Sequence, residues 1–155
     1  MSIVINSASE WQKLIEEKIP LSQALGFSIE SLTEDAIRCT APLEPNLNVH
    51  NTGFAGSLYS LCTLTSWTLI SHLMSVQKKT ASVLLREGNI RYLKPVEQSI
   101  TISAFLPEDH RLAEFISNFN TREKATLTLL SHVMQENEPL AEFCGEFVVS
   151  GIEPS

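Results

Sequence analysis

The longest apolar stretch of the chain extends from Ala55 to Met74 and dominates its hydropathy pattern. Apolar side chains would lie on every side of a helix formed by this stretch, and a helix that is apolar all round is a buried one. No Lys, Arg, Asp or Glu occurs between Pro45 and Gln77. The pattern therefore predicts a helix of roughly 30 Å at the centre of a domain.

A transmembrane span is the alternative interpretation, since about 20 apolar residues are enough to cross a bilayer. Seven Ser and Thr hydroxyls and the imidazole of His72 lie within the stretch. Each of these groups would need a hydrogen-bond partner in hydrocarbon, and the N-terminal flank lacks a clear basic anchor. We therefore expect a core helix and no membrane span.

Two shorter amphipathic helices are also predicted. Ser7 and Glu10 have the spacing of a capping box, and the helix that they open would end at Pro20. The residues from Leu21 to Leu25 are expected to form a turn. The second helix is indicated by apolar residues on one face, at Leu112, Phe115, Ile116 and Phe119.

Runs of apolar and polar residues predict strands at residues 27–32, 36–41, 82–96, 100–106, 125–135 and 140–150. The run 82–96 could form one long strand or two. Gly88 is expected to form a bulge in the long strand 82–96. Most of the connections are short enough for hairpins, so the strands should form one antiparallel sheet. A sheet of about six strands wrapped around one long helix is an α+β hotdog fold, and we expect residues 1–155 to form a single domain.

Composition narrows the function classes. A net charge of −7 argues against nucleic-acid binding, which needs a concentrated basic surface. The three cysteines form no CxxC pair, so neither a zinc site nor a disulfide framework is expected. No secretion signal is visible at the N-terminus. These features predict a cytoplasmic protein with reduced thiols, no metal and no cofactor.

Two motifs resemble the hotdog acyl thioesterases. Residues 48–58 read NVHNTGFAGSL and open the long helix, and residues 89–96 read NIRYLKPV and follow it in the chain. With the final hairpin, the resemblance covers nearly the whole sequence. Residues 54–61, FAGSLYSL, are most similar to a thioesterase family that some bacteria carry fused behind an N-acetyltransferase domain.

The start of the long helix is the first candidate for catalysis. Backbone N–H groups in a first helical turn have no helical partner and lie at the positive end of the helix dipole. Ala55 and Gly56 have little side chain, so a thioester carbonyl could approach these amides, which would stabilise an oxyanion. Asn48 could add a side-chain donor for the carbonyl or the attacking water. Alternatively, Asn48 and Asn51 only shape the turn and cap the helix.

Thr63 occupies the position at which many related thioesterases carry an Asp or Glu that activates water or attacks the thioester. Eight residues of helix, roughly 12 Å, separate it from Ala55. One chain cannot bring both to the same carbonyl. The resemblance implies a homodimer or a dimer of dimers, in which antiparallel helices join Ala55 of one subunit to Thr63 of the other. Alternatively, Thr63 bonds its own backbone.

Two other residues could supply a base. His50 is the only imidazole in the loop before the helix and could act as a general base. It could equally be an exposed loop residue. Glu87 is the nearest carboxylate in the sequence that could replace the missing one, or a surface charge paired with Arg86. A hotdog dehydratase would need a carboxylate where Leu64 lies, so hydrolysis is favoured over dehydration.

The substrate would be an acyl group on coenzyme A or on an acyl carrier protein. Positions in the two motifs that are expected to contact it are Thr52, Phe54, Ser57, Arg91 and Lys94. The basic residues could meet carrier phosphates, although scattered bases are usually just solvated. The sequence therefore predicts a thioester hydrolase. A non-catalytic acyl-binding or scaffold protein is the second hypothesis, favoured by the helix without acids.

Overall fold

The computed structural model describes residues 5–152. The elements are, in chain order, α1 (Ala8–Lys18), α2 (Leu21–Leu25), β1 (Ser28–Leu32), β2 (Ala36–Ala41), the 3₁₀ helix η1 (Glu44–Asn46), α3 (Ala55–Val76), β3 (Ala81–Tyr92), β4 (Ile100–Phe105), α4 (His110–Arg122), β5 (Lys124–Gln135) and β6 (Glu138–Gly151). The strands form one antiparallel sheet in the order β1-β2-β4-β5-β6-β3.

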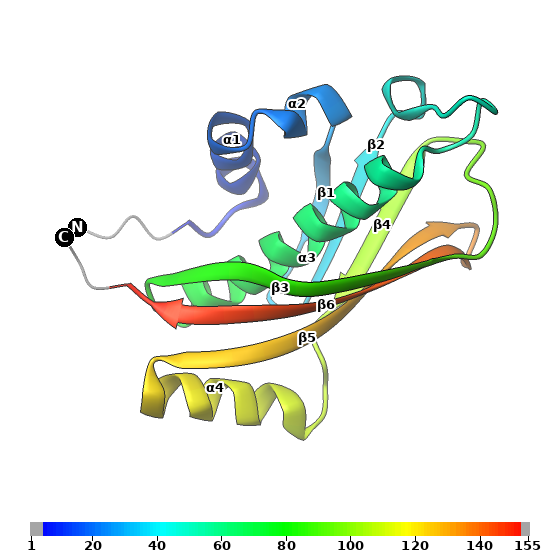
Figure 1. Cartoon of the computed structure of the whole chain (residues 1–155). Helices are drawn as coiled ribbons and strands as arrows, with labels where there is room; N and C mark the ends of the chain where they lie inside the picture. The colour runs from blue at the N-terminus through cyan, green and yellow to red at the C-terminus, as the bar shows by residue number, and fades with distance from the viewer. Residues whose placement is uncertain (1–4, 153–155) are drawn as a thin grey trace.

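The sheet curves around α3, which crosses its concave face (Figure 1). Helix α3 contacts five of the six strands, while α1 packs on β1 and α4 packs on β5. This arrangement is the hotdog fold that the sequence predicts. Among the described residues no helix is both long and apolar enough to cross a membrane.

The core lies between α3 and the inner face of the sheet. Leu61 and Ile70 of α3 have no exposed surface, and neither do Phe143 and Phe147 of β6. Alternate residues of β5 and β6 are buried, as the pattern of the sequence predicts. Complete burial of such a side chain contributes about 1.5–3 kcal/mol, so these contacts fix the position of α3 on the sheet.

Several boundaries differ from the sequence predictions. Residues 21–25 form the helix α2 and not a turn, with Gly26 in the left-handed conformation at its end. The long strand ends at Tyr92, before Pro95, and β4 ends before Leu106. The last hairpin turns on Glu136 and Asn137, both with positive φ, and β6 begins at Glu138.

The predicted bulge at Gly88 is wrong. The register of β3 shifts between Leu85 and Glu87, while Gly88 is in register with Gly145. A Cβ at position 88 would lie 2.1 Å from the Tyr59 hydroxyl oxygen of α3. Glycine is therefore needed here because helix and strand approach closely.

The two edges of the sheet differ. Strand β1 has five residues and an irregular register with β2. Strand β3 has 12 residues and, within residues 5–152, pairs only on its β6 side. Its outer edge presents unpaired backbone groups, which in a native protein are normally covered or paired with another strand.

Candidate active site

The loop before α3 is held by a buried asparagine. Asn46 is 1% exposed, and its Nδ2 donates to the carbonyl oxygens of Leu25 (2.8 Å) and Pro42 (2.9 Å). The backbone carbonyl oxygen of Asn46 accepts a hydrogen bond from the Phe54 amide at 2.7 Å. The last residue before α3 is thus attached to the body of the protein, which sets the direction in which the helix starts.

Asn48 organises the tip of this loop. Its Oδ1 accepts from the amides of His50 (2.8 Å) and Thr52 (3.1 Å). Its Nδ2 donates to the Thr52 hydroxyl at 2.8 Å and lies 3.4 Å from the carbonyl oxygen of Gly53. The structure shows the turn-shaping role of Asn48, and a donor role toward a substrate would require exchange of one of these bonds.

The first turn of α3 leaves backbone donors unused. Phe54 makes no side-chain cap, and the first helical bond is donated by Leu58 to the Phe54 carbonyl at 3.1 Å. Within the part of the chain that the structure describes, the amides of Ala55, Gly56 and Ser57 have no hydrogen-bond partner. These N–H groups can bind a negatively charged oxygen at the positive end of a 22-residue helix.

The side chains around these amides are an aromatic ring and a phenol. The ring of Phe54 is 52% exposed and lies against Gly56, whose absent Cβ would be 2.6 Å from Phe54 Cε2. The Tyr92 hydroxyl donates to the Ala55 carbonyl oxygen at 2.8 Å. Burial raises the pKa of Tyr92, so the phenol stays protonated and attaches the end of β3 to the helix start.

A half-buried stripe runs along α3, on the side of the helix next to β3. It consists of Gly56, Tyr59, Ser60, Thr63 and Trp67, at the spacing of one helix face, whereas the neighbouring positions are buried. The Trp67 indole donates to the Val83 carbonyl oxygen at 2.9 Å. The stripe and the free edge of β3 therefore form one continuous surface.

The hydroxyl of Thr63 bonds its own helix. Its Oγ1 donates to the Tyr59 carbonyl oxygen at 2.9 Å. A hydroxyl that donates in this way keeps its lone pairs, so Thr63 can accept a hydrogen bond from a water molecule. One chain does not bring Thr63 to the Ala55 amide, because eight residues of helix separate them by roughly 12 Å.

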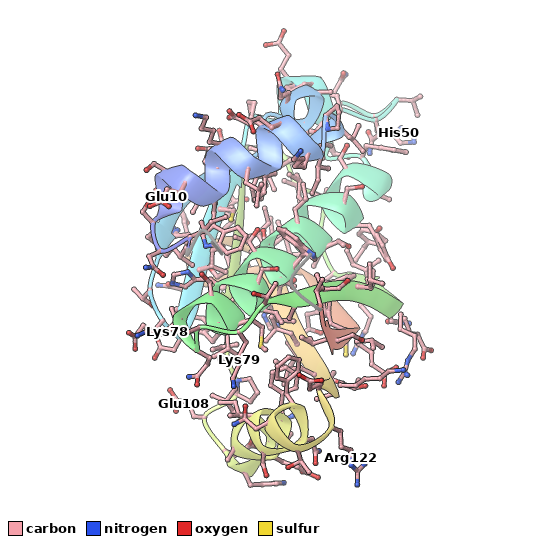
Figure 2. The ribbon with its side chains drawn as sticks, turned by 90° about the vertical axis from the view of Figure 1, so that its left-hand side faces the viewer. Glu10, His50, Lys78, Lys79, Glu108 and Arg122 are labelled. Carbon is pink, nitrogen blue, oxygen red and sulfur yellow. The ribbon has the colours of Figure 1, made fainter. Side chains whose placement is uncertain are left out.

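His50 is exposed at the tip of the loop, and Figure 2 shows it at one end of the molecule, with Lys78 and Lys79 toward the other. Glu87 is exposed on β3. Because position 88 faces Tyr59 and side chains alternate along a strand, Glu87 faces away from α3. The predicted pair of Glu87 with Arg86 is wrong, since Arg86 bonds Glu146 at 2.7 Å.

The expected substrate-binding residues fall into two groups. Thr52, Phe54 and Ser57 lie at the helix start, where the Thr52 hydroxyl is engaged with Asn48 and Ser57 is buried. The second group consists of the basic residues Arg91 and Lys94, on either side of Tyr92 in the sequence. Arg91 lies 3.9 Å from Glu142, and Lys94 pairs with Glu138. Both pairs are solvent-exposed, so an incoming phosphate could compete for them.

The buried thiols do not act as nucleophiles. Burial raises the pKa of Cys39 and of Cys62 to about 12, so both stay protonated. Within residues 5–152, no three His, Cys, Asp or Glu side chains are grouped in a way that could hold a metal ion.

Sequence reasoning missed Asn46 and Tyr92 as residues that position the helix start. Both act across long separations in the chain, Asn46 toward Leu25 and Tyr92 toward Ala55. The run NIRYLKPV contained a usable signal, because a tyrosine beside a proline-terminated strand end can reach a neighbouring loop. The polar character of Asn46 gave no such signal, since asparagine is also common in exposed turns.

Comparison with known proteins identifies relatives for nearly the whole chain. A family model described as "Putative thioesterase (yiiD_Cterm)" matches residues 8–151. A protein of unknown function from Chlorobaculum tepidum is similar in structure with a TM-score of 0.87, at 27% identity over 94% of each chain.

Two further solved structures have the same architecture. A "putative thioesterase" from Shewanella oneidensis has a TM-score of 0.83 and 27% identity, over 94% of this chain and 97% of that chain. A thioesterase from Haemophilus influenzae has a TM-score of 0.74 at 15% identity, over 97% and 94% of the two chains, and supports the fold alone.

Proposed function

Because the chain belongs to the YiiD_C family, we propose that it hydrolyses an acyl thioester carried by coenzyme A or by an acyl carrier protein. The observation that carries this proposal is the start of α3, where three consecutive amides lack partners within the described residues. This is the arrangement that stabilises the oxyanion of a tetrahedral intermediate. The absent side chain of Gly56 leaves room for the Phe54 ring, which lies against the helix start and is 52% exposed.

The reaction proceeds by attack of water on the thioester carbon. A bond forms between the water oxygen and the thioester carbon, and the electron pair of the C=O double bond moves onto the carbonyl oxygen. The amides of Ala55 and Gly56 bind this oxyanion. Collapse of this intermediate breaks the carbon–sulfur bond and releases the thiolate. The proton lost by the water ends on the thiol, so the products are a carboxylic acid and the free thiol of the carrier.

The site is shared between two subunits of a homodimer. A twofold axis at the middle of the free β3 edge would pair Ala81 with Tyr92 of the partner subunit. Since Tyr92 bonds the Ala55 carbonyl and Trp67 bonds the Val83 carbonyl within each chain, the partner's helix start would lie at the level of Trp67. Thr63 is one turn away on the same half-buried stripe. The dimer would thus bring both halves of the site together.

Thr63 positions the water in this arrangement. It accepts a hydrogen bond from the water while its own hydroxyl continues to donate to the Tyr59 carbonyl oxygen. A threonine is too weakly basic to take the proton alone. His50 can serve as the base, because its exposed loop lies at the end of the molecule where α3 starts. Glu87 contributes less, since its side chain faces away from α3.

The second candidate function is acyl-thioester binding without hydrolysis. The observation that favours it is the absence of Asp, Glu, Lys and Arg from α3. A panel of acyl-CoAs with short, medium, long and aryl acyl groups separates the two functions when release of free thiol is followed. Thiol release above the spontaneous rate supports the enzyme; saturable binding of an acyl-CoA with no release from any member overturns it.

We place this activity in the cytoplasm. The three cysteines, Cys39, Cys62 and Cys144, are all free thiols, as is usual in a reducing compartment. The reaction needs no metal or cofactor beyond the coenzyme A or carrier that forms part of the substrate. Arg91 and Lys94 are the bases that could contact carrier phosphates beside the helix start. A dimer of dimers would preserve the same shared site.

A further inference from the structure

The peptide group between Ala55 and Gly56 is bonded to Tyr92 at its oxygen and is free at its nitrogen. The Tyr92 hydroxyl donates to the Ala55 carbonyl oxygen at 2.8 Å. The N–H of the same peptide group belongs to Gly56 and has no hydrogen-bond partner among residues 5–152. Because a peptide group is planar and trans, its C=O and N–H bonds point in opposite directions. The group therefore accepts from Tyr92 on one side and presents a free donor on the other.

A hydrogen bond to a carbonyl oxygen also acts on the N–H of the same peptide group. It draws electron density toward the oxygen and leaves the N–H more positive, and hydrogen bonds linked in this way strengthen one another by about 10–30% per bond. In the first turn of a helix, moreover, no helical bond holds the N–H end of the group. The Tyr92 hydroxyl therefore both orients and polarises the Gly56 N–H.

The strand end that carries Tyr92 is fixed by the neighbouring strand. Tyr92 is in register with Ala141 of β6. The amides of Leu93 and Lys94, which follow it, both donate to the Leu140 carbonyl oxygen, at 2.9 and 3.1 Å. Burial raises the pKa of Tyr92, so its hydroxyl keeps the proton that it donates. The phenol is thus a donor whose position is set by the sheet and not by the helix.

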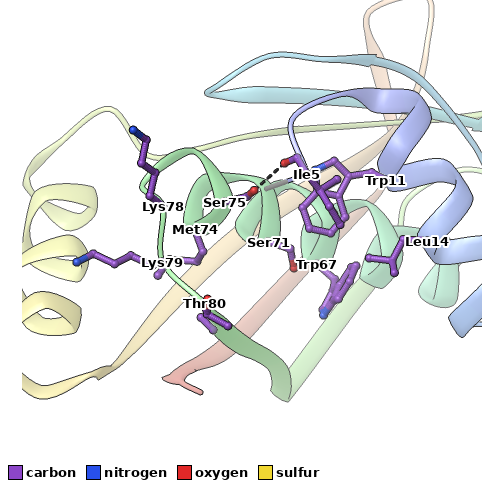
Figure 3. A pocket seen from close by; sticks show the side chains of 11 residues that line it. Ile5, Trp11, Leu14, Trp67, Ser71, Met74, Ser75, Lys78, Lys79 and Thr80 are labelled. Atoms are coloured by element: carbon purple, nitrogen blue, oxygen red, sulfur yellow. Dashed lines mark hydrogen bonds between the residues drawn. The ribbon is translucent and has the colours of Figure 1, made fainter. Parts of the chain in front are cut away.

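The groove at the other end of α3 belongs to the shared hydrolytic site. It lies between α1, α3 and the start of β3, and Trp67 and Ala81 are among the residues that line it (Figure 3). In the proposed dimer the partner's Tyr92 would lie opposite Ala81, and the partner's helix start would lie at the level of Trp67. Tyr92 would therefore act at this site from the subunit that supplies the oxyanion donors.

We propose that Tyr92 is a positioning residue for hydrolysis, whose hydroxyl orients and strengthens the Gly56 N–H through the Ala55 carbonyl. This role rests on the proposed hydrolysis at the start of α3. Tyr92 acts through the peptide group and not on the reacting atoms. Because the oxyanion develops only as the transition state is approached, its loss should lower kcat and leave KM nearly unchanged. A purely structural attachment of β3 to α3 would instead affect stability alone.

Kinetics of two variants separate the hydroxyl from the ring. Tyr92→Phe keeps the ring and is expected to lower kcat for thiol release roughly tenfold, with KM within about twofold of the native value. This loss is smaller than the 10²- to 10³-fold cost of removing an oxyanion donor, because the Gly56 N–H remains. Tyr92→Leu should lower kcat little further. Unchanged kcat in Tyr92→Phe, or a rise in KM alone, overturns the proposal.

Amide NMR tests the same hydrogen bond without hydrolysis. Polarisation of a peptide group by a donor at its oxygen changes the chemical shift of its nitrogen. Tyr92→Phe should therefore move the Gly56 nitrogen shift by more than those of Ala55 and Ser57. Because phenylalanine retains the aromatic ring, the ring's own effect on these shifts is largely preserved. A Gly56 change no larger than those of its two neighbours overturns the proposal.

Ser60→Ala is the matched control, since the Ser60 hydroxyl donates to the next carbonyl oxygen, that of Gly56, at 2.9 Å. The N–H of that peptide group belongs to Ser57, so this variant should move the Ser57 nitrogen shift most. Two different failures can be distinguished. A native chain that releases no thiol overturns hydrolysis whatever the Gly56 shift, whereas an active chain in which Tyr92→Phe leaves kcat or the Gly56 shift unchanged overturns the role of Tyr92.

Discussion

The amide of Ala55 can be removed with little effect on the fold. Proline is favoured at the first position of a helix, where its missing N–H has no helical partner. Phe54, the preceding residue, has φ −66° and ψ 130°, which is the extended conformation that proline requires of its neighbour. The site therefore offers a rare substitution that deletes a single backbone donor.

Ala55→Pro is expected to lower kcat for thioester hydrolysis by roughly 10²- to 10³-fold, the usual cost of one lost oxyanion donor. The midpoint of urea unfolding should stay near that of the native chain. Ala55→Ser keeps the N–H group and should retain activity. Full activity in Ala55→Pro, measured by thiol release, would show that this amide does not hold the oxyanion.

A substitution at Gly88 would test the close approach of α3 and β3. The next atom that an added Cβ would meet, after the Tyr59 hydroxyl, is Tyr59 Cζ at 3.0 Å. The Tyr59 ring is in turn in edge contact with Phe143, with centroids 5.2 Å apart. The ring therefore cannot move freely to make room.

Gly88→Ala is expected to lower the free energy of unfolding by roughly 1–3 kcal/mol, the usual cost of overpacking. Adding Tyr59→Phe removes the closest atom and should recover part of this loss, so the double variant should be more stable than the sum of the two single effects. Urea unfolding of the four proteins measures the coupling. Simple additivity would contradict the contact.

Single residues were predictable from sequence where their role is local. The small residues Ala55 and Gly56 follow an Asn-rich loop. That the helix begins here, with free backbone amides in its first turn, depends on neighbouring residues in the sequence only. Tyr92 could not be assigned in this way, because its partner lies 37 residues away. Gly88 was predicted to form a bulge, but it is in regular register, and its lack of a side chain makes room for a tyrosine of another element.

At the scale of elements, α1 is attached to α3 through a buried histidine. The Trp11 indole donates to His72 Nδ1 at 3.1 Å, and His72 is 4% exposed. This bond requires an unprotonated Nδ1. Burial lowers the pKa of His72 below its ordinary value of 6.5, although the charge of Glu34 acts in the opposite direction. The folded protein therefore favours the neutral imidazole.

The lowered pKa of His72 determines how the free energy of unfolding changes with pH. In the unfolded chain His72 binds a proton more readily than in the folded one, so the stability that it contributes is complete above about pH 6.5 and is lost as the pH falls below that value. We expect the free energy of unfolding to fall between pH 7.5 and pH 5 by more in the native chain than in His72→Gln. Parallel pH profiles from urea unfolding would contradict this role.

The elements themselves followed from periodicity. The alternating runs gave six strands, and the spacing of Phe115 and Phe119 gave α4, both of whose phenylalanines are buried. Periodicity could not place the register shift beside Arg86, because a bulge depends on both paired strands. The five residues of α2 were mistaken for a turn because a single helical turn carries too little apolar pattern to distinguish the two.

For the whole molecule, the free edge of β3 and the half-buried stripe of α3 are two parts of one surface. Leu84 on β3 is 65% exposed and Tyr92 is 48% exposed. A long edge strand with exposed apolar side chains is usually covered in a native protein. A partner subunit would cover this edge and place its helix start beside Thr63, so that neither chain holds a complete site alone.

The most direct test of this shared site mixes two defective variants. Ala55→Pro damages the oxyanion half, and Thr63→Ala, which removes the water-positioning hydroxyl, is expected to lose roughly 10²-fold in rate. Thr63→Ser should retain activity. When the two variants are unfolded together and refolded, half of the dimers are mixed, and each mixed dimer has one intact site. We predict recovery of about a quarter of native thiol release. No recovery above the separate variants, in a preparation shown to contain mixed dimers, would contradict a site built from two chains.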